Sequence, residues 1–291
     1  MPPDPGTDVF EAHRPRLVRL AYRMLGSVTE AEDIVQDAWL RWRRADRTDV
    51  REPGAFLARI VARLCLDAMK SSRARRELYL GSWLPEPFIE PEPDAADPDE
   101  LTLTLMLALE RLSPLERAAF LLHDVFDVPL HDVAATLDRD AAAVRQLAVR
   151  ARQHVRAARP RYPVAREEAD RVALAFFQAS STGDLDALRA MLAQTVVAQA
   201  DGGGKVRAFL NPIVGRDRVL RMFEGLHRKQ IVHPAALIRL ERIDGLPGYI
   251  SRSGDGVLQT TALAIEDGRI EGIYITRNPD KLIHIARIVA A

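Results

Sequence analysis

The sequence predicts a multidomain protein in which two all-α helical domains precede an α+β, cone-shaped domain. Up to about residue 160, apolar residues recur at helical spacing. Beyond that point, strand-like stretches are separated by Asp-Gly and Gly-Asp-Gly turns, which are typical of hairpins. We therefore expect helical domains at residues 8–76 and 101–160, a linker at 77–100 and the α+β domain at 164–291.

Composition limits the class of protein. The 291 residues suffice for two or three domains. A formal net charge of zero excludes a uniformly basic nucleic-acid binder, so DNA affinity must come from a local excess of basic side chains. The single cysteine, Cys65, excludes a disulfide framework within the chain, which fits a reducing cytoplasm. The N-terminal segment has no signal-peptide pattern and no apolar run approaches ~18 residues, so we expect a cytoplasmic protein without a membrane span.

The first domain is expected to contain three helices, at residues 9–25, 31–45 and 55–76. Gly26 ends the first helix. Residues 27–30 form a start signal for the second helix, with acidic side chains in its first turn, where the helix dipole favours them. The third helix begins at Pro53-Gly54 and is rich in basic residues beside its apolar stripe.

Residues 112–159 predict a helix-turn-helix. Ser113 followed by Pro114 is a helix-start signal. The last helix of the motif has an apolar stripe and, on the other side, a mainly basic face: Arg145, Gln146, Val149, Arg150, Arg152 and Arg156. Such a helix can lie in the major groove of DNA, where arginine pairs with guanine or clamps phosphates. From this stretch alone, a solvated basic helix in an ordinary bundle stays open as the alternative.

Two longer runs carry a family resemblance. AEDIVQDAWLRWRRA at 31–45, followed by residues 53–77, resembles region 2 of extracytoplasmic-function sigma factors. The run from LSPLER at residue 112 to RQHV at 155 resembles their region 4. The order and the separation of the two runs match that family. The resemblance implies an initiation factor that binds core RNA polymerase, through its clamp and flap regions, and promoter DNA.

The resemblance also assigns residues to contacts. The helix face expected to dock on the polymerase clamp carries Asp33, Gln36, Asp37 and Trp39, although Trp39 could equally belong to the core. The positions expected to meet the opened −10 element are Arg47, Arg51, Arg59, Arg63, Lys70 and Arg73. The positions matching the −35 contacts are Arg145, Gln146, Val149 and Arg150. Phosphate contacts, which position the protein without reading sequence, are expected from Arg139, Arg152 and Arg156.

The linker at residues 77–100 is acidic and rich in proline, so it is interpreted as a connection rather than a packed element. Its first half is too apolar for an inert spacer. Trp83 and Leu84 stand beside prolines, and such an exposed tryptophan usually has a docking surface. Local packing onto region 2 is the alternative.

The last part of the chain predicts helices followed by a curved antiparallel sheet. Helices are expected at residues 164–180, 184–192 and 215–228. Strands are expected at residues 195–200, 205–210, 236–243, 248–253, 257–266 and 269–277. This half resembles the SnoaL-like, nuclear-transport-factor-2-like superfamily.

Three short segments sharpen the resemblance: WLPEP at 83–87, DGGGK at 201–205 and NPDKL at 278–282. In this order they are similar to sigma factors that carry a fused SnoaL-like extension. That implies an extension which replaces a separate anti-sigma factor, and which both supports and restrains activity. The residues expected to make regulatory contacts are Trp83, Leu84, Pro85, Asp201, Gly202, Gly203, Gly204, Lys205, Asn278, Pro279 and Asp280.

The glycines of DGGGK free the backbone to bend sharply. The segment lacks the second half of a phosphate-binding loop, so a turn that contacts the linker or the sigma regions is expected instead.

Nothing in the chain predicts catalysis. The candidate acids are Asp201, His227, His233, Asp244 and His284, and no two have a recognisable acid/base spacing. No His/Cys cluster suggests zinc. We expect no catalytic residue, cofactor or metal, and leave open a small apolar ligand in the cone domain. The alternative functions are a one-component DNA-binding regulator that senses such a ligand, and a fusion enzyme; a run like region 2 argues against the first.

Overall fold

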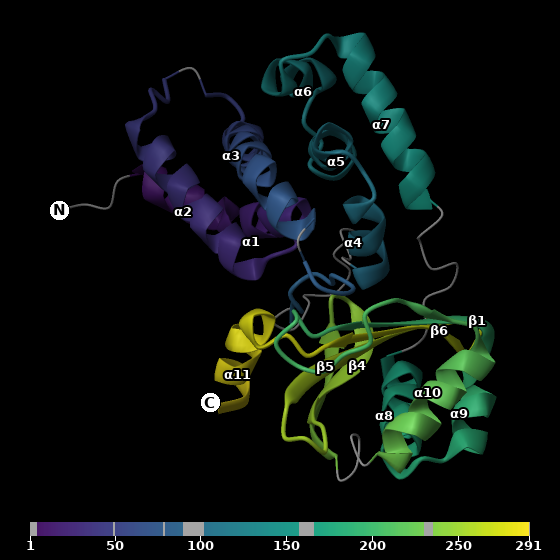
Figure 1. Cartoon of the computed structure of the whole chain (residues 1–291). Helices are drawn as coiled ribbons and strands as arrows, with labels where there is room; N and C mark the ends of the chain where they lie inside the picture. The colour runs from purple at the N-terminus through teal and green to yellow at the C-terminus, as the bar shows by residue number, and fades with distance from the viewer. Residues whose placement is uncertain are drawn as a thin grey trace. The chain divides into compact units, whose positions relative to one another are not determined.

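The computed structural model describes residues 5–48, 50–77, 79–89, 102–156, 166–229 and 235–290. The chain divides into two compact units. The first combines Met1–Glu77 with Leu105–Arg159 and is helical, whereas the second combines Leu78–Thr104 with Pro160–Ala291 and contains the sheet (Figure 1). The predicted fold class, helical domains followed by an α+β domain, is confirmed.

The first three helices are α1 (Pro5–Leu25), α2 (Val28–Arg44) and α3 (Pro53–Glu77). Ser27 caps α2, because its hydroxyl accepts a hydrogen bond from the Glu30 amide at 3.1 Å. Gly26 follows α1 with a φ of 70°, a conformation that suits glycine. The side chains that the three helices bury together include Phe10, Leu17, Leu20, Val35, Leu57 and Val61. The predicted helices and the start and stop signals between them are confirmed.

The helix-turn-helix is also confirmed. Its elements are α4 (Leu103–Glu110), α5 (Pro114–Phe120), a π-turn (Leu121–Val125), α6 (Leu130–Leu137) and α7 (Ala141–Arg156). Ser113 and Glu116 cap α5 reciprocally, as a capping box with proline at the first position. Asp138, with a φ of 53°, ends α6 and makes the tight turn into α7.

A buried arginine joins the two helical groups of the first unit. Arg117 of α5 is 1% exposed, and its guanidinium donates to the Met24 carbonyl at 2.6 Å and to Glu110 Oε1 at 2.7 Å. A buried charge is tolerated when it is paired and hydrogen-bonded. The carbonyl at the end of α1 and the carboxylate at the end of α4 provide these partners.

The sheet of the second unit has six strands in the order β2-β1-β6-β5-β4-β3. The strands are β1 (Leu192–Asp201), β2 (Ile213–Val214), β3 (Ala236–Ile243), β4 (Leu246–Arg252), β5 (Leu258–Glu266) and β6 (Arg269–Thr276). The predicted sheet was antiparallel throughout, but β1 runs parallel to β6. A parallel pair is possible here because the long connection between these two strands includes α10 and the strands β2, β3, β4 and β5.

Helices α8 (Arg166–Thr182), α9 (Leu185–Met191) and α10 (Arg216–Arg228) gather on one side of the sheet (Figure 1). Tyr249 of β4 belongs to the core that these helices share with the sheet. The next residue, Ile250, belongs to a second apolar cluster with Leu282 and Ile285. Successive strand residues point to opposite faces, so α11 (Ile283–Ala290) covers the other face of the sheet.

One of the predicted strands was wrong. Residues 205–210 form turns and irregular backbone rather than a strand, because the amides of Lys205 and Val206 both turn back to the Gly202 carbonyl. Among the described residues, Ile213–Val214 is the segment that pairs with β1 on that side. His284, one of the candidate acids, lies in helix α11, on which Ile285 is buried and Ile283 is exposed.

Candidate functional site

The exposed face of α7 carries the side chains predicted to read the −35 element. The buried face of this helix consists of Val144, Leu147, Ala148, Ala151 and Val155. The exposed side chains are Arg145, Gln146, Val149 and Arg150. Val149 is 42% exposed, which is unusual for valine and leaves its methyl groups available for contact. In the part of the chain that the structure describes, Arg145 and Gln146 have no side-chain partner.

Two arginines of α7 form ion pairs with acidic residues of α5 and of the segment Leu121–Val125. Arg150 Nε lies 2.7 Å from Glu116 Oε1, and Arg152 Nε lies 2.6 Å from Asp124 Oδ1. Burial opposes ionisation of Glu116, but hydrogen bonds from Arg150 and Ser113 hold its pKa below the ordinary value. Arg150 would therefore have to leave Glu116 to contact a base. The side chain of Arg156 lies outside the described part of the structure, and Arg139 is exposed at the turn.

Two of the predicted −10 residues contact α6 within the first unit. Arg59 of α3 forms an ion pair with Asp132, with 2.9 Å between Nη1 and Oδ1. Arg63 donates to the Ala135 carbonyl at 3.0 Å and to the Thr136 carbonyl at 3.4 Å. These carbonyls belong to the last turn of α6, where the helix dipole favours a cation. In this conformation the guanidinium groups of Arg59 and Arg63 are both bound to the helix-turn-helix.

The other predicted −10 residues have separate surroundings. The Arg47 guanidinium stacks on the Trp42 ring, 5.4 Å from its centroid. Arg51 is exposed. Lys70 pairs with Asp67 of its own helix at 2.8 Å. The side chain of Arg73 lies outside the described residues.

The predicted polymerase-binding face of α2 is exposed at Asp33, Gln36 and Asp37. Trp39 is half-buried beside Phe10, with 5.0 Å between the ring centroids. The neighbouring Trp42 is 3% exposed and donates its indole N–H to the Gly6 carbonyl. Trp39 is therefore part core and part surface, whereas Trp42 belongs to the core.

The three signature segments of the second unit meet around one carboxylate. Asp201 is completely buried at the end of β1. Its carboxylate accepts from the Tyr79 hydroxyl at 2.5 Å, the Leu84 amide at 2.9 Å and Lys281 Nζ at 2.8 Å. The Gly203 amide supplies a fourth donor at 3.0 Å. We call this cluster the linker clasp; its members are Tyr79, Trp83, Leu84, Asp201, Asn278 and Lys281.

Lys281 also contacts the linker directly. Its ammonium lies 4.2 Å from the centre of the Trp83 ring and 4.9 Å from that of Tyr79. It also donates to the Leu84 carbonyl. Cation–π contacts of this kind strengthen when they are desolvated. Asn278 completes the clasp by donating to the Tyr79 hydroxyl at 2.8 Å.

The Tyr79 hydroxyl stays protonated in this setting. Burial and the hydrogen bond to Asp201 raise the pKa of Tyr79 well above its ordinary value. It can therefore donate to Asp201 and accept from Asn278 at any ordinary pH.

The linker is also fixed further along. His284 Nε2 lies 2.5 Å from the Pro87 carbonyl. The Asp244 amide donates to the Phe88 carbonyl at 2.8 Å, and the Asp244 carbonyl accepts from the Leu103 amide at 2.8 Å. Residues 79–89 are thus packed against the α+β domain, which corrects the interpretation of this segment as an unpacked connection. The part of the linker at residues 90–101 lies outside the described residues.

DGGGK forms a turn at the clasp, as predicted, and not a phosphate loop. Gly203 has a φ of 62°, and a Cβ there would lie 2.3 Å from Asn278 Nδ2. A Cβ on Gly204 would approach Leu80 of the linker at 3.3 Å. Lys205 lies outside the buried cluster, where it pairs with Asp280 at 2.5 Å.

Sequence reasoning missed Tyr79 and Lys281 as members of the clasp, and it named Asp244 and His284 only as candidate acids and not as linker contacts. Lys281 stands within NPDKL and could have been included from that segment. Of the predicted set, Pro85 is buried and Pro279 is exposed.

The candidate acids do not gather at a common catalytic site. Asp201, Asp244 and His284 bind the linker, and none of them lines the cavity of the α+β domain. His227 does not line it either, and His233 lies outside the described residues. Across the described ranges there is no group of His, Cys, Asp and Glu suited to a metal ion, and no helix long and apolar enough to cross a membrane.

Comparisons with known proteins agree with this architecture. Residues 9–75 match sigma-70 region 2, and residues 102–155 match sigma-70 region 4. The ECF RNA polymerase sigma factor SigJ of Mycobacterium tuberculosis is 37% identical, over 94% of this chain and 91% of that protein. The probable ECF RNA polymerase sigma factor SigI of the same species is 36% identical, over 96% of this chain and 95% of that protein. The match with the crystal structure of SigJ covers 95% of this chain and 98% of the SigJ chain, with a TM-score of 0.75 and 34% identity.

These matches define a sigma factor for transcription initiation. The chain belongs to the extracytoplasmic-function (ECF) RNA polymerase sigma factors, and its helical regions 2 and 4 precede the α+β domain. Sigma factors bind core RNA polymerase and promoter DNA, and the family is not enzymatic.

Proposed function

We propose that this chain is a cytoplasmic alternative sigma factor that is regulated in cis by its SnoaL-like domain instead of a separate anti-sigma factor. Region 2 would read the −10 element and region 4 the −35 element. The observation that carries the regulatory part is the linker clasp, in which the connection between regions 2 and 4 is held by Asp201 and Lys281.

The covalent geometry explains why the clasp matters. A fully extended chain spans about 3.3–3.6 Å per residue, so a free connection from Glu77 to Leu103 would let the two regions separate by up to roughly 90 Å. Contacts at Leu84, Phe88 and Leu103 fix this connection at several points along its length. Binding at two promoter elements needs a particular separation, so the clasp can limit which separations are reached.

The arginines of α3 support a restraining direction of control. Arg59 and Arg63 are expected to meet the −10 element, yet both contact α6 in the clasped chain. Apparent affinity falls in proportion to the fraction of molecules that are competent to bind. We propose that the clasp favours this state and so restrains initiation, and that its release increases the competent fraction.

Run-off transcription with purified core RNA polymerase tests the sigma assignment. The full chain should initiate from a promoter found by selection only when the core enzyme is present. Arg145→Ala should cost about 1–3 kcal/mol of discrimination at the −35 element. Gln153→Ala, which changes another exposed residue of α7, is the matched control and should leave this discrimination unchanged.

The second candidate function is a one-component regulator that senses a ligand. The match of residues 9–75 to region 2 favours the sigma factor, because a simple regulator has no use for that region. Tight duplex binding by the protein alone, with no initiation in the presence of core polymerase, would favour the regulator.

A further inference from the structure

The SnoaL-like domain contains a cavity of about 480 Å³ between α8, α10 and the sheet. This volume is within the range of small-molecule sites in proteins. Much of its wall is apolar and partly aromatic, with Phe176, Phe177, Phe209, Met222 and Tyr249. Flat aromatic walls suit a ligand with an apolar body.

Polar side chains in the wall, among them Ser251 and Arg277, have atoms without the partners that buried groups normally have. Ser251 is 1% exposed, and its hydroxyl has no hydrogen-bond partner among the described residues. The same holds for Nε of Arg277, a residue that is 7% exposed. Buried polar atoms are nearly always hydrogen-bonded, so such atoms in a cavity wall point to a ligand or a water that would bond them.

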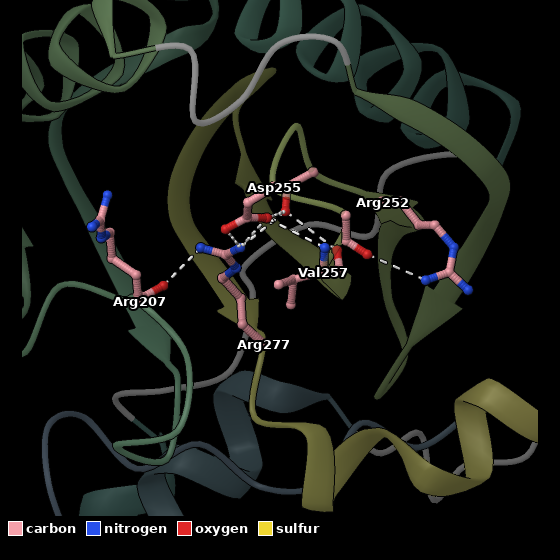
Figure 2. Close-up of polar contacts among 7 residues, drawn as sticks. Arg207, Arg252, Asp255, Val257 and Arg277 are labelled. Carbon is pink, nitrogen blue, oxygen red and sulfur yellow. Dashed lines mark hydrogen bonds and ion pairs between the residues drawn. The ribbon is translucent and has the colours of Figure 1, made fainter.

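The charged side chains that line the cavity are all basic. Its charged side chains are Arg207, Arg221, Lys229 and Arg277, and the lining includes no acidic side chain among the residues that the structure describes. The Arg277 charge is compensated, because its Nη2 lies 2.7 Å from Asp255 Oδ2 (Figure 2). Arg207, Arg221 and Lys229 are exposed, and none has a side-chain partner within the described ranges. The cavity therefore has an excess of uncompensated positive charge.

We propose that this cavity binds a small organic acid with an apolar body and a single carboxylate. Arg207 and Arg221 would hold the carboxylate, because the planar guanidinium can pair with it through two parallel hydrogen bonds. The apolar body would lie against the phenylalanines, and the Ser251 hydroxyl would face it from the wall. A neutral analogue keeps only the apolar contacts, and a cationic analogue is repelled.

The cavity and the linker clasp share a border at Arg277. The Arg277 amide donates to the Asp201 carbonyl at 2.7 Å, and its side chain donates to the Arg207 carbonyl at 2.7 Å. A bound acid would therefore contact the segment that carries the clasp carboxylate. This consequence for regulation rests on the proposed function, whereas ligand binding itself does not.

The test uses the full chain and three probes of one shape: 2-naphthoate, 2-naphthalenemethanol and 2-naphthylmethylamine. Thermal unfolding and calorimetry, both without polymerase, measure binding. We expect 2-naphthoate at millimolar concentration to raise Tm by mass action, the alcohol to raise it less and the amine not at all. The wild-type protein alone thus tests the charge preference: equal shifts with the acid and the alcohol, or no shift with the acid, would overturn the proposal.

Variants locate the site. Arg207→Gln combined with Arg221→Gln should weaken 2-naphthoate binding by about tenfold or more, since each charge-assisted hydrogen bond contributes on the order of 1.5–3 kcal/mol. Arg218→Gln removes an exposed arginine of α10 that does not line the cavity and should change nothing. Unchanged affinity in the double variant would place the carboxylate elsewhere and refute the assignment. Because no transcription is measured, failure here leaves the sigma assignment untouched.

Discussion

Lys281 Nζ lies 2.8 Å from Asp201 Oδ2, and their side chains are 10% and 0% exposed. A buried ion pair is stable only when its remaining hydrogen-bonding groups are also satisfied. Here the carboxylate accepts from four donors, and the ammonium contacts a carbonyl and two aromatic rings. The pair joins the ends of β1 and β6 to the linker that connects regions 2 and 4.

Removing the charge of Asp201 should release the linker. Asp201→Asn leaves Lys281 buried without a counter-ion, and breaking a buried pair costs about 3–5 kcal/mol. We expect hydrogen exchange at the Leu84 amide to accelerate strongly, because this amide donates to Asp201.

The matched control is Lys205→Met. Lys205 and Asp280 also join DGGGK to NPDKL, but their side chains are 54% and 59% exposed. An exposed pair contributes about 0–1 kcal/mol, so exchange at Leu84 should stay as in the wild type. Similar exchange in both variants would show that the buried pair does not hold the linker.

Gly203→Ala should open the clasp by steric conflict. A Cβ on Gly203 would lie 2.3 Å from Asn278 Nδ2, and the φ of 62° adds backbone strain. Gly268→Ala is the control, because its φ is 71° but nothing lies within 4 Å of the added Cβ. Both variants should lose about 1 kcal/mol through strain. Only Gly203→Ala should also expose Trp83, as measured by fluorescence quenching with iodide; equal quenching in the two variants would contradict the clasp geometry.

Asp132→Asn should make Arg59 available to DNA. The two side chains form an ion pair at 2.9 Å and are 26% and 30% exposed, so the pair contributes about 0.2–1 kcal/mol. We expect binding of a single-stranded −10 oligonucleotide, measured by fluorescence anisotropy, to tighten about two- to fivefold. The control is Asp138→Asn, which changes the net charge by the same amount as Asp132→Asn but at an exposed residue. A gain of the same size in that control would attribute the effect to net charge rather than to Arg59.

The stability of the α+β domain should depend on pH through Asp255. Burial opposes its ionisation, but hydrogen bonds from Ser253 and the ion pair with Arg277 lower its pKa below the ordinary 3.8 (Figure 2). The folded state thus favours the charged form. The resulting stability is present above the ordinary pKa and is lost as pH falls through the lowered one. The Tm advantage of wild type over Asp255→Asn should therefore shrink below about pH 4; a constant difference from pH 7 to pH 3 would contradict this.

The helices were predictable because their signals are local. Ser27, Ser113 and Asp184 each cap a helix by accepting an amide hydrogen bond from three residues further along. Such contacts depend on spacing in the sequence. The exposed face of α7 followed from helical periodicity in the same way.

The clasp and the arginine contacts depend on residues far apart in the chain. Tyr79 and Asn278 are separated by 199 positions, and Arg63 and Thr136 by 73. The sequence could suggest that the three signature segments act together, but not that Asp201 is the shared acceptor. For the same reason, pairing of Arg150 with Glu116 could not be anticipated from α7 alone.

The most direct test of the regulatory claim is run-off transcription by full-length Asp201→Asn, compared with wild type and with Lys205→Met at equal core polymerase and promoter. Each protein is first shown to be folded by its thermal transition. Because the clasp restrains initiation in this account, Asp201→Asn should yield more transcript than wild type, and Lys205→Met the same amount. Equal or lower transcript from Asp201→Asn, with its Leu84 amide exchanging rapidly, would contradict the account.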